Sequence, residues 1–142
     1  MTVASLFFVV ETRPQPQGSM VRGRHGGIHS DNKHLAGFRE AVGWSALAAL
    51  RDGRIPMAGE HVPVSLDCNF YFERPKSVKA ERTFPAVRPD LDKLCRAVCD
   101  ACTGVLWADD GQVCEIHASK FYGAPERAEV TVRLAATEGV RE

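Results

Sequence analysis

Residues 62–72 constrain the fold more than any other segment, because two kinds of side chain alternate along the whole segment. One set is apolar and consists of Val62, Val64, Leu66, Cys68, Phe70 and Phe72. The other set is mostly polar and consists of Pro63, Ser65, Asp67, Asn69 and Tyr71. A period of two predicts a β-strand with one buried face. Such a strand needs partner strands and a covering layer, so the chain must form a sheet that packs against other elements.

Periodic spacing places five further elements around this strand. Apolar residues at helical spacing predict helices at about 32–51 and 91–103. β-branched, aromatic or alternating residues predict strands at 3–10, about 112–122 and about 127–135. The predicted order is therefore β-α-β-α-β-β.

Turn residues predict the connections. Prolines and a glycine make 13–19 an extended loop, and 20–31 is rich in Gly, Arg and His, which predicts a mobile loop. Three prolines make 73–89 a long loop, and long loops in compact domains are often functional. We expect Asp31 or Asn32 to cap the first helix.

The length of 142 residues suits one domain that buries a core without cross-links. We expect one α/β (α+β) domain over 1–142, a mixed β-sheet packed by two helices, with a frayed tail at about 136–142. The apolar start carries no preceding Lys or Arg and is too short to span a bilayer, so we expect a strand and a cytoplasmic protein without a membrane partner.

Charge is balanced over the chain but unevenly distributed. The formal net charge is zero, which argues mildly against DNA binding. Residues 73–96 carry seven basic and four acidic residues, whereas 107–142 carry four basic and seven acidic residues. A basic segment therefore flanks a pair of carboxylates, although a solvated loop with the same charges remains an alternative.

That pair is Asp90 and Asp92, at the predicted start of the second helix. Both can point off the helix N-terminus, and one of Asp109 and Asp110, in the turn before the next strand, can complete a cluster of three carboxylates. Such a cluster suits Mg²⁺, which prefers oxygen ligands and keeps several waters. The alternative for each aspartate is structural, as a helix cap or as part of an Asp-Asp-Gly turn.

Arg96 lies one helical turn after Asp92, on the same predicted face. Its guanidinium can pair with a carboxylate or stabilise charge that develops on a phosphate, and it stays charged at any working pH.

The block from Arg88 to Val113 resembles the RusA family of Holliday-junction resolvases (crossover junction endodeoxyribonucleases), which are common in phages and prophages. The family signature runs close to K/R-P-D-x-D-N-L-x-K-x-x-x-D-A-L-x-G, then about four residues, then D-D-x-Q-V. The positions that match in register are Pro89, Asp90, Asp92, Leu94, Asp100, Ala101, Gly104, Asp109, Asp110, Gln112 and Val113. Segments 13–19, 74–77 and 115–123 also look like the family, so the resemblance covers nearly the whole chain.

The resemblance implies a homodimer that cuts four-way DNA junctions with Mg²⁺, or with Mn²⁺ as a substitute, in recombination and repair within a bacterial or phage-infected cell. The essential carboxylates of the family match Asp90, Asp92 and Asp110, as metal ligands, and its catalytic lysine matches Arg96. Two departures are Lys93 in place of the usual Asn and Arg96 in place of the usual Lys. Arginine cannot donate a proton as lysine can, so the expected role of Arg96 is electrostatic.

Branched DNA is the expected partner, and basic side chains are the candidates for phosphate contacts. They are Arg13, Lys76, Lys79, Arg82, Arg88 and Lys93. Zero net charge and the two departures leave open a protein that binds junctions without cutting them, as a decayed prophage product.

Cysteines and histidines offer a third, zinc-structured alternative. Cys95, Cys99 and Cys102 share one helical stripe, but three ligands from one helix make an awkward tetrahedron, and buried free thiols are common. Three histidines could also be ligands, although surface or DNA-facing roles are more usual. They are His25, His29 and His34. We expect Trp44 and Trp107 in the core or at an interface.

Overall fold

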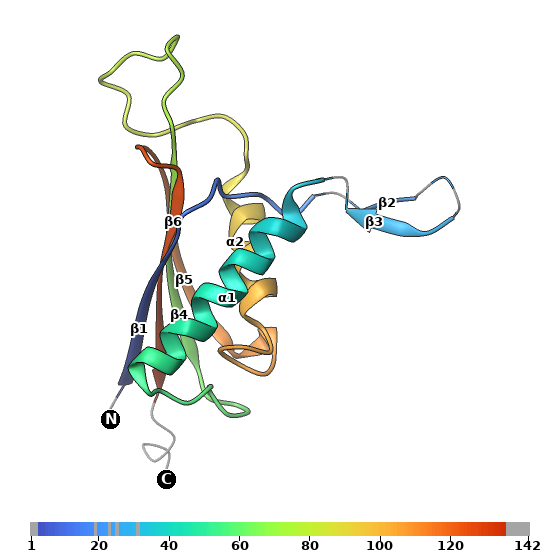
Figure 1. Cartoon of the computed structure of the whole chain (residues 1–142), viewed down its shortest axis with the longest axis vertical. Coiled ribbons are helices and arrows are strands. Elements are labelled where there is room, and N and C mark those ends of the chain that lie inside the picture. Colours follow the sequence, from blue (N-terminus) through green and yellow to red (C-terminus); the bar gives the residue numbers. More distant parts are fainter. Residues whose placement is uncertain (1–2, 19, 23, 25, 31, 136–142) are drawn as a thin grey trace.

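The computed structural model describes residues 3–18, 20–22, 24, 26–30 and 32–135. Its main body is a four-stranded mixed sheet with two helices on one face (Figure 1). This confirms the predicted α+β class and the order of the main elements. His25, Asp31 and the expected frayed tail at 136–142 lie outside the described residues.

The sheet has the strand order β1-β6-β4-β5. Its strands are β1 (Val3–Val10), β4 (Val64–Phe72), β5 (Val113–Tyr122) and β6 (Arg127–Ala135). β6 pairs antiparallel with both β1 and β4, whereas β4 and β5 are parallel. β5 therefore forms one edge of the sheet, and the chain must cross over the sheet between β4 and β5, which α2 does.

The alternation in β4 is borne out by burial. Within β4, Ser65, Asp67 and Asn69 are partly exposed, whereas Leu66, Cys68 and Phe70 are completely buried. The buried side chains face the helices and join the hydrophobic core. The partly exposed side chains stand on the other face of the sheet.

Two helices cover the apolar face. They are α1 (Leu35–Gly53), which packs on β1 and α2, and α2 (Leu91–Cys102), which packs on α1 and β5. α1 begins three residues later than expected and has His34 at its N-cap position without a side-chain cap. Asn32 instead accepts a hydrogen bond from the backbone N–H of His34 at 3.0 Å, so it stabilises the turn before the helix.

The prediction of a mobile loop at 20–31 was wrong for its ends. Two short strands, β2 (Met20–Arg22) and β3 (Ile28–Ser30), pair antiparallel as a hairpin beside the main body (Figure 1). Gly26 between them has φ 90, a conformation that glycine adopts without strain. Backbone pairing across this turn therefore supplies order that composition did not indicate.

The two tryptophans differ. Trp107 is completely buried, as expected, but Trp44 is 65% exposed, so the core part of that prediction was wrong for it. The buried stripe of α1 includes Phe38, Val42 and Ala46, and Trp44 lies on the opposite side of the helix.

No helix in the described part of the chain is long and apolar enough to cross a membrane.

Candidate active site

The first turns of α2 carry the predicted catalytic residues. Asp90 is at the N-cap position with extended backbone, and its side chain makes no capping hydrogen bond. Asp92 follows in the first turn, and Arg96 is one turn further along the same face. The Asp90 side chain therefore does not cap the helix, which was the alternative role, and its exposed carboxylate is available to a ligand.

A pocket between α2 and β5 brings Asp92, Arg96 and Asp110 together. Asp100, two turns after Asp92, lines the same pocket, so three carboxylates and one guanidinium border it. The remaining lining is mostly apolar and comes from Leu91, Cys95, Cys99, Val113, Ile116 and Ala118. Among the described residues no ion pair uses Arg96, so its charge is not neutralised by a direct partner.

The turn before β5 separates the two neighbouring aspartates. Residues Asp110–Gln112 form a short 3-10 helix, η1, and Asp109 is its N-cap. The Asp109 carboxylate accepts a hydrogen bond from the backbone N–H of Gly111 at 2.9 Å. The Asp109 carboxylate thus stabilises its own turn, whereas Asp110 lines the same pocket as Asp92.

Asp110 is held by a side chain from the end of α2. The hydroxyl of Thr103 donates to Asp110 Oδ1 and also lies 2.8 Å from the carbonyl of Cys99. A hydroxyl has one proton, so these two acceptors share it. The indole N–H of the buried Trp107 donates to Thr103 Oγ1 at 3.0 Å, which fixes the orientation of the hydroxyl.

Asp90 lines a neighbouring hollow rather than this pocket. The hollow lies between the loop at 13–18, the start of α1 and the start of α2, and it also contains Arg13, Arg88 and Lys93. A backbone hydrogen bond of 3.0 Å from Gln17 N to the Lys93 carbonyl holds the first loop against α2. The structure therefore brings two of the three predicted carboxylates into one pocket and leaves Asp90 beside basic side chains next to it.

The carboxylates of the pocket suit some metal ions better than others. Within the described residues, no three His, Cys, Asp or Glu side chains converge closely enough to hold one. Mg²⁺ needs less, because it usually takes one or two protein carboxylates and completes its octahedron with waters and substrate phosphates. Asp92 and Asp110 fit that chemistry, so they suit Mg²⁺, while the complete set with Asp90 stays a prediction.

The thiols beside the carboxylates do not gather with other ligands into a metal-binding group in the part of the chain that the structure describes. All five cysteines are free. Burial raises the pKa of Cys95 to about 11, with a smaller contribution from the charge of Asp92. Burial also raises the pKa of Cys99 to about 12, with smaller contributions from Cys95, Asp110 and Asp100. Both thiols are therefore protonated at ordinary pH and form part of the apolar wall of the pocket.

The basic residues expected to contact phosphates differ in exposure and in whether their charge is paired. Arg13 forms a salt bridge of 2.5 Å with Glu126 and lies over the ring of Phe72, so its charge is partly neutralised. Lys76, Lys79 and Arg82 are exposed in the long loop, which extends beyond the end of the sheet and returns to α2 (Figure 1).

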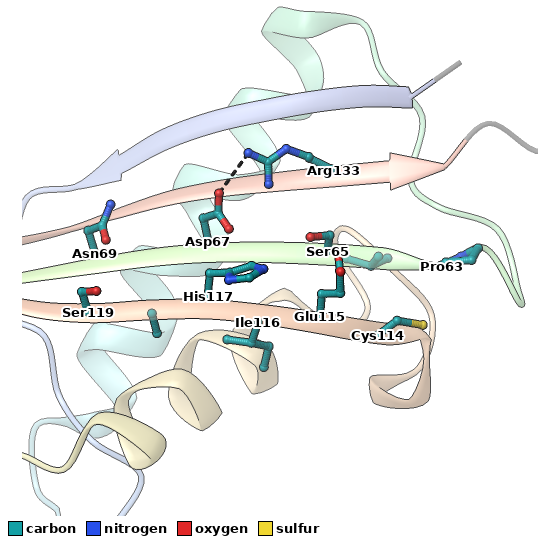
Figure 2. A pocket seen from close by; sticks show the side chains of 12 residues that line it. Pro63, Ser65, Asp67, Asn69, Cys114, Glu115, Ile116, His117, Ser119 and Arg133 are labelled. Carbon is teal, nitrogen blue, oxygen red and sulfur yellow. Dashed lines mark ion pairs between the residues drawn. The ribbon is translucent and has the colours of Figure 1, made fainter. Parts of the chain in front are cut away.

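A second hollow lies on the face of the sheet away from the helices (Figure 2). Polar side chains of β4, β5 and β6 line it, and Arg133 forms a salt bridge of 3.0 Å with Asp67 there. None of the predicted catalytic residues lines this hollow. The chemistry expected from the sequence is therefore confined to the side of α2 and the edge strand β5.

A family model described as Endodeoxyribonuclease RusA matches residues 11–133. The chain belongs to the RusA family. The match includes α2, η1 and β5, and therefore every residue of the pocket. A curated relative in Bacillus subtilis (strain 168), described as the uncharacterized protein YqaN, is 38% identical over 81 residues. That alignment covers 50% of this RusA-family chain and 57% of the relative, so the chain spans little more than half the relative's length.

Sequence reasoning did not predict the positioning role of three residues. Thr103 holds Asp110, Gln112 organises the turn, and Lys120 donates to the carbonyls of Val87 and Pro89 at 2.6 and 2.8 Å. Lys120 thus ties β5 to the residue before Asp90. The signals in the sequence were that Thr103 shares the helical face of Asp92 and Arg96, that Gln112 matches the family signature, and that Lys120 lies in a segment that resembles the family.

Proposed function

We propose that this RusA-family protein is a Mg²⁺-dependent, structure-specific DNA endonuclease that resolves four-way junctions by paired nicks, in recombination and repair. The observation that carries the proposal is the shared pocket of Asp92, Arg96 and Asp110 at the edge of the sheet. Basic side chains lie next to it in the hollow around Asp90. Carboxylates for a metal and cations for a phosphate are the two needs of phosphodiester hydrolysis.

The aspartates and Arg96 have different proposed roles in cleavage. Asp92 and Asp110 would hold Mg²⁺ from the pocket, with Asp90 as the third expected ligand from the neighbouring hollow. An ion bound there would supply Lewis-acid chemistry, polarising a phosphate and making a nearby water more acidic. Arg96 stabilises the negative charge that develops on the phosphate, a task that needs a fixed cation but no proton transfer.

The basic residues bind the backbone of branched DNA. Arg88 and Lys93 lie beside the carboxylates and position the phosphate, and the exposed cations of the long loop contact an adjoining arm. Paired nicks at symmetry-related strands require two equivalent sites, so we also propose a two-fold homodimer.

The test compares three aspartates in one assay, the cleavage of a synthetic four-way junction in Mg²⁺. Asp92→Asn and Asp110→Asn should each abolish paired nicking, because an amide is a poorer ligand than a carboxylate, while junction binding persists. Asp109→Asn is the matched control, because its amide oxygen can still accept the hydrogen bond from Gly111, and it should cut normally.

Two outcomes would contradict this assignment. Normal cleavage by Asp92→Asn or Asp110→Asn would show that the pocket is not the catalytic centre. Tight junction binding by the unmodified protein without nicks, in both Mg²⁺ and Mn²⁺, would favour a junction-binding protein, which Lys93 and Arg96 in place of the family's Asn and Lys would then help to explain.

A further inference from the structure

An aromatic side chain stands exposed in the basic loop that leads to α2. Phe84 is 60% exposed, and Val87, three residues later, is 63% exposed. Their loop also carries Lys76, Lys79 and Arg82, all exposed. Single exposed apolar residues are common on surfaces, so exposure alone carries no function.

The Phe84 ring packs against a neighbouring aromatic ring. Its centroid lies 5.4 Å from the ring of Phe121, which stacks on Tyr71 at 5.3 Å. The guanidinium of Arg127 lies 3.9 Å from the centroid of Tyr71 and completes the row. Among the described residues, Phe84 is therefore the last ring of a row that begins on the sheet, and most of its surface is exposed to solvent.

The backbone on both sides of Phe84 is also fixed. The N–H of Tyr122 donates to the carbonyl of Thr83 at 2.9 Å, and Lys120 holds the carbonyls of Val87 and Pro89. Pro89 immediately precedes Asp90. The ring therefore has a set position relative to the start of α2, unlike a side chain on a freely moving loop.

We propose that Phe84 stacks on a base at the branch point of the DNA, while the cations of its loop contact the phosphates on either side. This inference rests on the proposed function and adds a source of selectivity to it. Bases inside a duplex are covered on both faces by their neighbours, whereas a branch point offers a base face that an aromatic ring can cover. Aromatic stacking is independent of base identity, so Phe84 would recognise the branch and not the sequence.

The experiment uses the full chain carrying Asp92→Asn, so that junctions bind without being cut. Phe84→Ala should weaken binding to a four-way junction by about ten- to hundredfold, the loss typical for one base–aromatic stack, with little effect on duplex DNA. It should also remove the fluorescence change of a 2-aminopurine placed at the branch point. Phe84→Tyr should restore both, because it keeps the ring.

The chain offers a matched control in Phe7. It is also 60% exposed, but it lies on β1, the strand at the other edge of the sheet from β5. Phe7→Ala should leave junction affinity and the 2-aminopurine signal unchanged. Both sites are on the surface, so both variants should fold.

Each other result overturns the inference in a recognisable way. Unchanged junction binding by Phe84→Ala removes the stacking role and leaves the proposed function intact. An equal loss on duplex and junction makes Phe84 a general DNA contact, and a changed oligomeric state in size-exclusion chromatography makes it a contact with a second copy of the chain. Failure of the parent protein to bind junctions overturns the proposed function together with this inference.

Discussion

Asp109 and Asp110 are neighbours with the same chemistry and different surroundings. The carboxylate of Asp109 closes its own turn through the N–H of Gly111. That of Asp110 receives the hydroxyl of Thr103 and lines the pocket with Asp92. A carboxylate that is held by one neutral donor keeps most of its lone pairs for a ligand, so Thr103 orients Asp110 without neutralising it.

Thr103→Val should test this positioning role. The substitution keeps the shape but removes the hydroxyl, so Asp110 loses its donor and the indole N–H of Trp107 loses its acceptor. We expect junction cleavage to fall about ten- to hundredfold at low Mg²⁺ and to recover partly at high Mg²⁺, because a loosened ligand weakens metal binding. The measurement is the cleavage rate as a function of Mg²⁺ concentration.

Thr103→Ser is the control for this variant, since it restores the hydroxyl and should restore the Mg²⁺ dependence. A parallel loss of rate at every Mg²⁺ concentration would argue against a role through the metal ligand. Thermal unfolding of both variants would separate this effect from the loss of the hydrogen bond to Trp107.

The site could be predicted from the sequence only as far as its chemistry. Spacing gave a face with Asp92 and Arg96, and the resemblance pointed to Asp110. The choice between Asp109 and Asp110 depends on backbone dihedrals within a three-residue turn, which the Asp-Asp-Gly sequence does not determine. Helical spacing puts Thr103 on the face of Asp92 and Arg96, but its partnership with Asp110 exists only once α2 and η1 fold against each other.

Among the elements, η1 connects the site to the sheet through Gln112. This side chain is buried, and its carbonyl accepts hydrogen bonds from the N–H groups of Ala108 and Asp109, both at 2.9 Å. Its amide donates to the carbonyls of Gly59 and Val62 at 2.8 and 3.1 Å. One side chain thus satisfies four backbone groups of two loops and fixes the turn that carries Asp110.

Gln112→Met should destabilise the fold by about 2–4 kcal/mol, because it keeps the length of the side chain but leaves partly buried backbone groups without partners. Urea denaturation measures the loss. Gln15→Met is the matched control in a more exposed loop, and it should change stability by about 0.5 kcal/mol or less. Comparable losses in the two variants would mean that the Gln112 hydrogen bonds do not hold the turn.

Helices and strands were predicted correctly where a periodic sequence pattern coincided with burial. They were missed where backbone pairing alone determines the structure. The strand around Leu66 and the helix that begins at Leu91 have strong patterns, and their bounds agree with the structure to within about two residues. The hairpin of β2 and β3 is only three residues a side, too short for a pattern to emerge. α1 begins later than predicted because the side chain of Asn32 accepts a hydrogen bond from the N–H of His34 and stabilises a turn before the helix. Asparagine is common both in such turns and at helix N-caps, so the residue type alone does not distinguish the two roles.

At the scale of the whole molecule, the core between the sheet and α2 is rich in thiols. Cys68 on β4 and Cys102 on α2 are completely buried, and burial raises the pKa of each well above its ordinary value of 9.0. The neighbouring thiols of Cys95 and Cys99 add to the effect at Cys68. The helix layer is therefore attached to the sheet through groups that must remain protonated.

This arrangement predicts a loss of stability at alkaline pH. Each pKa is raised in the folded state, so the stabilising contribution is complete below pH 9.0 and is lost as the pH rises from 9.0 toward the folded value. At about pH 10.5, one such thiol costs about 2 kcal/mol, because it ionises in the unfolded chain but not in the core.

Cys68→Val should therefore lose less stability than the parent between about pH 8 and about pH 10.5. Urea denaturation at the two pH values measures this difference, and Cys114→Val, which alters an exposed thiol, should match the parent. The same loss in all three proteins would assign the alkaline sensitivity to other groups and would remove the thiols from the account of what holds α2 on the sheet.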